Sequence, residues 1–128
     1  MRAILDAHVF LWWNMDAPQL SRVAREFIAD GGNELFFSAA SAWEIAIKWK
    51  RGRLVLPEVP AVYVASRMAA QRIHPLPVQV SHALHVSTLP EIHPDPFDRL
   101  LIAQSQLEDI PILTADAAIA QYEVNVLW

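Results

Sequence analysis

Short apolar runs alternate with amphipathic stretches along the chain, and this pattern predicts strands separated by helices. The predicted strands are residues 3–5, 35–37, 111–114 and 124–127, with an extended segment containing two prolines at 73–78. Strands this short and apolar are typical of a parallel sheet that is covered on both faces. We therefore predict an α/β fold, with a short-stranded, mainly parallel central sheet flanked by helices, as a single domain over residues 1–128.

Apolar periodicity and capping residues place helices between these strands. Ser21 is the predicted N-cap of a helix that runs to about Ala29, and Asp95 followed by Pro96 is a strong helix start. The predicted helices cover residues 9–13, 22–29, 39–49 or 42–49, 61–72, 81–87, 96–108 and 115–121. The expected apolar faces are Val23, Ala24, Phe27 and Ile28 in the second helix, and Val62, Ala65, Met68 and Ala69 in the fourth.

The composition is that of an ordered, compact chain. Of the 128 residues, 54% are hydrophobic and only 3 are glycine, which leaves little room for disordered linkers. Because cysteine is absent, disulfides and thiolate metal sites are excluded. No apolar run reaches the roughly 18 residues of a membrane span. The first predicted strand follows Met1 almost at once, so we expect no signal peptide and a cytoplasmic location.

Four acidic residues lie where predicted strands give way to helices: Asp6, Glu44, Asp98 and Asp116. The carboxyl ends of parallel strands meet at one edge of a sheet, so these side chains are expected to converge on one crevice. Carboxylates gathered in one crevice raise one another's pKa unless a cation is present. The arrangement therefore predicts a hard divalent metal and, with it, phosphate chemistry.

Each acid also has an ordinary structural explanation. Asp6 could close a strand, Asp116 could cap a helix, and Asp98 would be favoured by the helix dipole in a first turn. Glu44 completes a capping box if Ser41 is the N-cap, whereas a cap at Ser38 leaves Glu44 free to face the crevice. Because the acids recur at four separate junctions, the metal site is the better interpretation.

The charge distribution bears on the partner. The formal net charge of −4 argues at first against nucleic acid. If the four acids surround a metal, however, the rest of the chain is balanced, and local patches matter more than the total. The clearest patch is Lys48, Lys50, Arg51 and Arg53. It suits either phosphate contacts or the ordinary stabilisation of a helix C-terminus.

Further side chains are candidates for supporting the acids or contacting a substrate. These candidates are Thr114, Ser38, Arg99, His8 and Lys48. A guanidinium such as that of Arg99 can pair with a carboxylate or a phosphate. We also expect His93 to orient the loop at Asp95. His82 and His85 have a helical spacing suited to zinc but no evident third ligand, so they are interpreted as surface or packing residues.

With these residues in view, the whole chain resembles a known family, the PIN-domain ribonucleases, and specifically the VapC-type toxins of toxin–antitoxin pairs. The segments that carry the resemblance are ILDAHV (4–9) with LWW (11–13), LS (20–21), SAASAWEIAIK (38–48) with GRL (52–54), HPDPFDRLLIAQ (93–104) and LTAD (113–116). The segments 38–48 and 93–104 are specific when they occur together.

The resemblance implies a PIN-like fold and an endoribonuclease that depends on Mg²⁺ or Mn²⁺. By motif match, the acidic pocket would consist of Asp6, Glu44, Asp98 and Asp116, with Asp6 and Asp98 as the main metal ligands. It also implies a homodimer, an RNA substrate, a cognate antitoxin that covers the active site, and contact with DNA only through that antitoxin. Many relatives carry Thr or Ser where this chain has Ala7, and Thr114 or Ser38 is expected to compensate.

Two other functions remain open at this stage. The chain could be a catalytically weak binding module that acts with its antitoxin as a DNA-bound repressor complex, which Ala7 favours and the retained acids oppose. It could also be a housekeeping RNA-processing nuclease. Hydrolysis without a protein nucleophile agrees with the absence of cysteine and of a G-x-S-x-G motif.

Overall fold

The computed structural model describes residues 1–128 and contains a five-stranded sheet, in the order β3-β2-β1-β4-β5, in which all neighbouring strands are parallel. The strands are β1 (Arg2–Leu5), β2 (Glu34–Ser38), β3 (His74–Leu76), β4 (Ile112–Leu113) and β5 (Val126–Leu127). The predicted α/β fold with a parallel sheet is therefore confirmed. Because the chain leaves β1 towards β2 on one side and returns to β4 on the other, the sheet has a topological switch point at β1.

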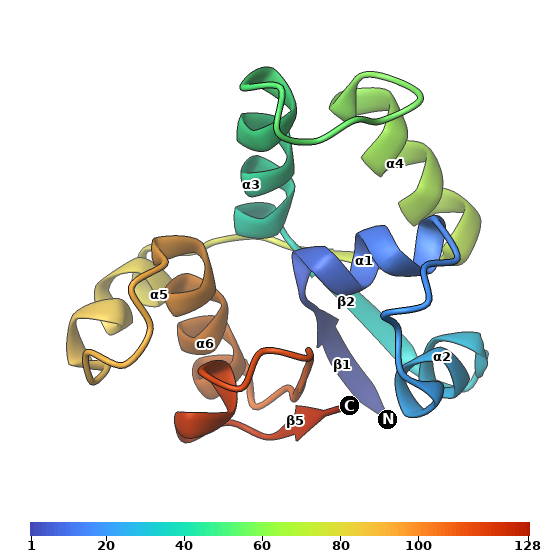
Figure 1. The fold of residues 1–128 in the computed structure, drawn as a ribbon. Helices are drawn as coiled ribbons and strands as arrows, with labels where there is room; N and C mark the ends of the chain where they lie inside the picture. The colour runs from blue at the N-terminus through green and yellow to red at the C-terminus, as the bar shows by residue number, and fades with distance from the viewer.

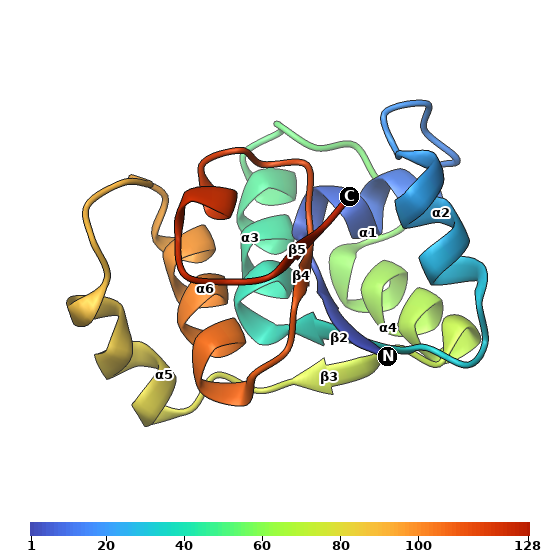
Figure 2. The same ribbon diagram turned by 90° about the horizontal axis from the view of Figure 1, so that it is seen from below.

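Helices cover both faces of this sheet (Figures 1 and 2). They are α1 (Ala7–Asn14), α2 (Arg22–Ala29), α3 (Ala39–Lys50), α4 (Pro60–Gln71), α5 (Val80–His85) and α6 (Pro96–Glu108), with 3₁₀ turns η1 (Val86–Thr88) and η2 (Ile119–Gln121). Helices α1, α2 and α4 lie together on one side of the molecule, and α5 and α6 on the other. None of the helices combines the length and the apolar character needed to cross a lipid bilayer.

Because side chains alternate between the two faces of the sheet along each strand, the hydrophobic core consists of two clusters. Ala3 and Leu5 belong to a cluster with side chains from α1, α2, α3 and α4, whereas Ile4 between them belongs to a second cluster with side chains of α6. Successive strand residues point to opposite faces, so a strand covered on both sides is apolar at every position. This explains why the strands appear in the sequence as continuous apolar runs.

The register brings the carboxyl ends of the three central strands to the same level. Leu5 pairs with Phe37 of β2 and with Leu113 of β4. The next residue of each strand or junction is therefore Asp6, Ser38 or Thr114, all at one edge of the sheet. This edge therefore holds three of the candidate residues.

Three details differ from the predictions. The buried residues of α4 are Tyr63 and Val64, and the predicted Met68 packs against the core, whereas Val62 is half exposed. In α2, Val23 is exposed and only Ala24 and Ile28 are buried. Residues 115–121 do not form a continuous helix: a turn leads into the short η2.

Candidate active site

Asp6 lies at the end of β1 and is the N-cap of α1. Its Oδ1 accepts a hydrogen bond from the backbone N–H of His8 at 2.8 Å, and its Oδ2 accepts one from the Thr114 hydroxyl at 2.6 Å. The residue is only 4% exposed. Burial raises its pKa, but the hydrogen bonds from His8 and Thr114 outweigh burial, and the net pKa is lowered. Asp6 is therefore held as a buried carboxylate.

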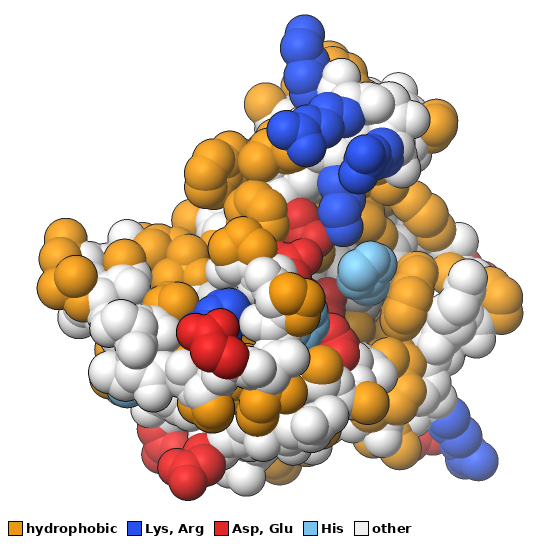
Figure 3. All heavy atoms as spheres, turned by 60° about the vertical axis from the view of Figure 1, so that its left-hand side comes forward, with side chains coloured by type: hydrophobic (Ala, Val, Ile, Leu, Met, Phe, Trp, Pro, Cys, Tyr) orange, Lys and Arg blue, Asp and Glu red, His pale blue; other side chains and the backbone are white.

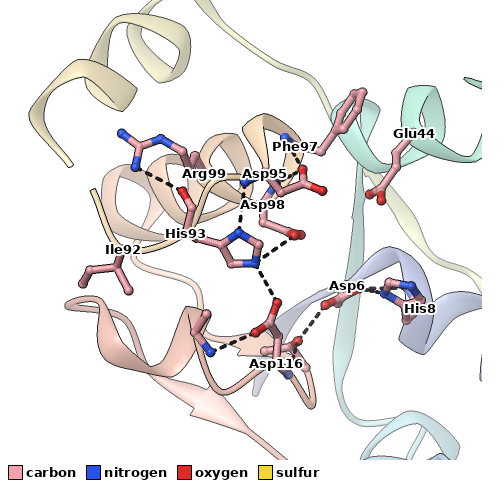
Figure 4. Close-up of polar contacts among 12 residues, drawn as sticks. Asp6, His8, Glu44, Ile92, His93, Asp95, Phe97, Asp98, Arg99 and Asp116 are labelled. Atoms are coloured by element: carbon pink, nitrogen blue, oxygen red, sulfur yellow. Dashed lines mark hydrogen bonds and ion pairs between the residues drawn. The ribbon is translucent and has the colours of Figure 1, made fainter. Parts of the chain in front are cut away.

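Glu44 owes its orientation to the cap of α3. The Ser38 hydroxyl accepts the N–H of Ala40 and is the N-cap, so Glu44 lies beyond the first turn and forms no capping box. Its side chain is buried. Its Oε2 forms an ion pair with Lys48, whose Nζ donates a hydrogen bond to it at 2.7 Å. Figure 4 shows the carboxylate pointing towards the space that Asp98 and Asp6 also face. The alternative in which Ser41 caps the helix is wrong.

Asp98 has a strongly raised pKa. It lies in the first turn of α6, whose N-cap Asp95 accepts the N–H groups of Phe97 and Asp98. Burial, followed by the negative charges of Asp6, Asp95 and Glu44, raises the pKa of Asp98 from 3.8 to about 7. The fold therefore brings two acids that are distant in the sequence, Asp6 and Glu44, close enough to oppose the ionisation of Asp98 together with its neighbour Asp95.

Asp116 is joined to Asp98 by a histidine. His93 Nε2 lies 2.8 Å from Asp116 Oδ2 and 3.2 Å from Asp98 Oδ2, and these three side chains form a group with the spacing of metal ligands (Figure 4). Asp116 Oδ1 also accepts the N–H of Ala118. Burial lowers the pKa of His93, but the Asp116 hydrogen bond and the nearby carboxylates raise it more.

His93 is the functional residue that sequence reasoning placed incompletely. Its predicted link to the Asp95 loop exists, since Nδ1 accepts the Asp95 N–H at 3.1 Å. Its position between Asp98 and Asp116, however, depends on a contact over 23 residues that no local pattern encodes. The only sequence signal was a histidine two residues before a helix cap in an acid-rich motif.

Two of the predicted supporting residues have structural roles instead. The Ser38 hydroxyl is fully buried and donates to Gln104 Oε1 at 2.5 Å, so it does not line the crevice. The Arg99 guanidinium donates to the carbonyls of Val86 and Pro90, at 3.2 and 3.0 Å, and is 9% exposed. Arg99 Nη2 also lies 3.6 Å from Glu91 Oε1, so of the two expected partners, a carboxylate and a phosphate, the structure shows the carboxylate.

The remaining candidates lie at the site. Thr114 holds Asp6 through its hydroxyl, and the Asp6 hydrogen bond raises the pKa of His8, whose Nδ1 lies 3.5 Å from Asp6 Oδ1. Lys48 is paired with Glu44 but remains 40% exposed. Ala7 is buried at the start of α1, and a hydroxyl reaches Asp6 from Thr114.

Two hollows border the acids. One, of about 280 Å³, is lined by Asp6, His8, Trp12, Thr114, Ala115 and Asp116. The other, of about 230 Å³, is lined by Glu44, Ile47, Lys48, Arg51, Arg53, Asp95 and Phe97. Figure 3 shows acidic side chains at the bottom of a depression, with Lys and Arg side chains gathered beside them. The surface thus offers an acidic cluster next to cationic side chains that suit an anionic chain.

Comparison with known proteins bears on this arrangement. The family model described as PIN domain matches residues 3–125, nearly the full chain. The chain belongs to the PIN domain family. Ribonuclease VapC16 of Mycobacterium tuberculosis is 44% identical over 61 residues, a match that covers 48% of this chain and 43% of that protein.

A solved structure extends the likeness to the whole PIN fold. The crystal structure of VapBC2 from Rickettsia felis, bound to a DNA fragment from its promoter, matches with a TM-score of 0.71 and covers 98% of this chain and 97% of that chain. At 10% identity it shows a shared fold.

The donors of this PIN domain fit a hard divalent cation. The facing groups are carboxylates from four segments, and carboxylate oxygens are the ligands that Mg²⁺ and Mn²⁺ prefer. Burial, followed by the charges of nearby carboxylates, raises the pKa of Asp98, and a cation would relieve the part that comes from repulsion by Asp6 and Glu44.

Proposed function

We propose that this PIN domain is an endoribonuclease that requires Mg²⁺ or Mn²⁺ and acts as the toxin of a toxin–antitoxin pair. The observation that carries the proposal is the convergence of Asp6, Glu44 and Asp98 on one crevice, where burial and then the neighbouring carboxylates raise the pKa of Asp98 to about 7. Acids that repel one another in this way indicate a cation-dependent site rather than a structural cluster.

We propose that Asp6, Glu44, Asp98 and Asp116 hold the metal, directly or through water. When bound, a divalent cation supplies positive charge that polarises the phosphodiester and activates water for in-line attack. The chain does the positioning: the His8 N–H and the Thr114 hydroxyl fix the Asp6 carboxylate. Fixed groups of this kind lower the barrier because they need not reorganise during the reaction.

Substrate binding is assigned to the cationic wall of the second hollow. Lys48, Arg51 and Arg53 line it together with Glu44. Cationic side chains next to a metal centre would hold the phosphates of a flexible single strand across the acids, and such contacts are independent of base sequence. The pairing of Lys48 with Glu44 also links the substrate wall to the acid cluster.

The partners follow from the relatives. The likeness to Ribonuclease VapC16 supports an RNA substrate, and the fold shared with VapBC2 supports a cognate antitoxin that binds DNA on behalf of the complex. A homodimer is proposed on the same family grounds. The hydroxyl that Thr114 supplies to Asp6 favours the active nuclease over a catalytically weak binding module.

Expression in a bacterial host separates the candidate functions. We expect the wild-type chain, induced without an antitoxin, to arrest growth and fragment RNA, and Glu44→Gln, which keeps the side-chain shape, to do neither. RNA fragmentation without growth arrest would instead indicate a housekeeping nuclease. If the wild type and Glu44→Gln are both folded and neither fragments RNA nor arrests growth, the nuclease proposal is wrong and the binding module is the better function.

A further inference from the structure

We propose that His93 is a positioning residue, whose Nε2–H bridges Asp98 and Asp116, and that it is not itself a ligand of the metal. The proposal rests on the acidic metal site proposed above and assigns a role to the one nitrogen-bearing side chain within it. By spacing alone His93 would count as a third ligand, because its Nε2 lies with the two carboxylates in a group suited to a cation.

The hydrogen bonds of the ring decide between the two roles. The backbone N–H of Asp95 donates to His93 Nδ1 at 3.1 Å, so Nδ1 presents its lone pair. A neutral imidazole with an acceptor at Nδ1 carries its proton on Nε2. That Nε2–H points at Asp116 Oδ2, 2.8 Å away, with Asp98 Oδ2 at 3.2 Å.

A metal-ligating histidine has the opposite arrangement. It binds the cation through the lone pair of one nitrogen and donates the N–H of the other, usually to a carbonyl or carboxylate. Binding through His93 Nε2 would move the proton to Nδ1, where it would face the Asp95 N–H. Ligation would therefore break a hydrogen bond of the loop that starts α6 and leave two N–H groups opposed.

The backbone around His93 gives the ring little freedom to escape this conflict. The Tyr122 hydroxyl accepts the His93 N–H at 2.7 Å and the Ile92 N–H at 3.2 Å, and donates to the Pro90 carbonyl at 3.0 Å. Arg99 donates to the same Pro90 carbonyl at 3.0 Å. The His93 side chain is 12% exposed. Arg99 and Tyr122 thus fix the loop from which His93 reaches the acids.

The bridge has a clear consequence for the metal site. Asp98 comes from α6 and Asp116 from the turn after β4, and no hydrogen bond joins these two residues directly (Figure 4). The His93 Nε2–H lies between them and offsets part of their mutual repulsion. It holds the two carboxylates at ligand spacing before a cation arrives, while their remaining lone pairs stay available.

Nuclear magnetic resonance of the ¹⁵N-labelled imidazole tests the assignment in the protein as it exists. At about pH 8.5, where a histidine is largely neutral, we expect His93 to show an unprotonated Nδ1 and a protonated Nε2, without a cation and with saturating Mg²⁺. A proton on Nδ1, in either state, would overturn the proposal. The cation-free spectrum decides the matter even if the chain binds no metal.

Affinity for Mn²⁺, measured by calorimetry, tests the positioning role. We expect His93→Ala to weaken binding roughly 10- to 100-fold, as outer partners of metal ligands do. His93→Gln, whose amide N–H can reach the same carboxylates, should restore binding to within a few fold. Equal Mn²⁺ affinity in the wild type and His93→Ala would overturn the positioning role. Pulsed electron paramagnetic resonance of the wild type that shows a ring nitrogen bound directly to Mn²⁺ would also overturn the proposal.

Failure of the proposed function looks different. If Asp98→Asn binds Mn²⁺ as tightly as the wild type, the acidic metal site is wrong, whatever the tautomer of His93. If Asp98→Asn loses Mn²⁺ binding and His93→Ala does not, the acidic metal site is supported and only the role proposed for His93 is wrong.

Discussion

Asp98 allows the acidic crevice to be tested without any substrate. In the metal-free protein, burial and the charges of Asp6, Asp95 and Glu44 raise its pKa from 3.8 to about 7. The folded state therefore binds a proton more tightly than the unfolded chain does between these two values. The contribution of Asp98 to stability is fully present below about pH 4 and is lost as the pH rises through about 7.

The size of this loss follows from the shift. Each pKa unit is worth about 1.4 kcal/mol, so the interval from 3.8 to about 7 corresponds to roughly 4 kcal/mol at most. The side chain is 18% exposed and partly solvated, which reduces the expected figure to roughly 2–4 kcal/mol. Asp98→Asn removes the charge and keeps the shape. At about pH 8, with chelator present, it should be more stable than the wild type by this amount.

Thermal and urea unfolding at about pH 4 and about pH 8 would measure the effect. At roughly 3–5 °C per kcal/mol for a domain of this size, the melting temperature of Asp98→Asn should exceed that of the wild type by roughly 6–20 °C at the higher pH. The two proteins should nearly coincide at the lower pH. Saturating Mn²⁺ should stabilise the wild type and leave the variant almost unchanged.

Asp30→Asn is a matched control, because this exposed carboxylate at the end of α2 lies outside the crevice and its contact with the Gly32 N–H survives in an amide. It should change neither the pH dependence nor the response to Mn²⁺. The reasoning would be refuted if Asp98→Asn were less stable than the wild type at about pH 8 in chelator, or if both showed the same decline with pH.

Three further variants test the roles assigned to neighbouring residues. Thr114→Val removes the hydroxyl from Asp6 and should cost roughly 1–3 kcal/mol in urea unfolding and weaken Mn²⁺ binding, whereas Thr114→Ser should preserve both. Arg99→Lys should lower the melting temperature markedly, because an ammonium cannot reach both carbonyls that the guanidinium contacts. Unchanged stability together with weaker RNA binding would show instead that Arg99 contacts the substrate. Ser38→Ala should cost about 1 kcal/mol for the lost cap, and more if Gln104 Oε1 is left unpaired, with normal RNA cleavage per folded molecule.

Local patterns predicted the elements that depend on local causes. The apolar runs identified the strands because a strand buried on both faces has no polar side, and Asp95-Pro96 and Ser21 marked helix starts because they satisfy free N–H groups. The predicted apolar face of α4 was wrong in part: Met68 packs against the core, but Val62 and Ala65 are exposed. Packing in the fold, which the apolar pattern does not specify, buries Tyr63 and Val64 in their place.

The candidate site divides in the same way. Parallel topology predicted that Asp6 and the later acids would converge, since it places strand ends at one edge. The contacts of His93 with Asp116 and of Arg99 with the carbonyls at 86–90 depend on loops meeting across the fold, which spacing along the chain does not specify. An arginine beside two aspartates suits either a carboxylate or a phosphate in the sequence, and in the structure Arg99 contacts Glu91 and carbonyls of the loop that carries His93.

The central claim is that these carboxylates form the metal site of an endoribonuclease, and cleavage of total cellular RNA by the purified protein tests it most directly. Wild type and Asp98→Asn would be compared with Mn²⁺, with Mg²⁺ and with chelator, each after its fold is verified. We predict discrete fragments from the wild type with either cation, none in chelator and none from Asp98→Asn. Equal cleavage by the folded variant, or cleavage by the wild type in chelator, would contradict the account.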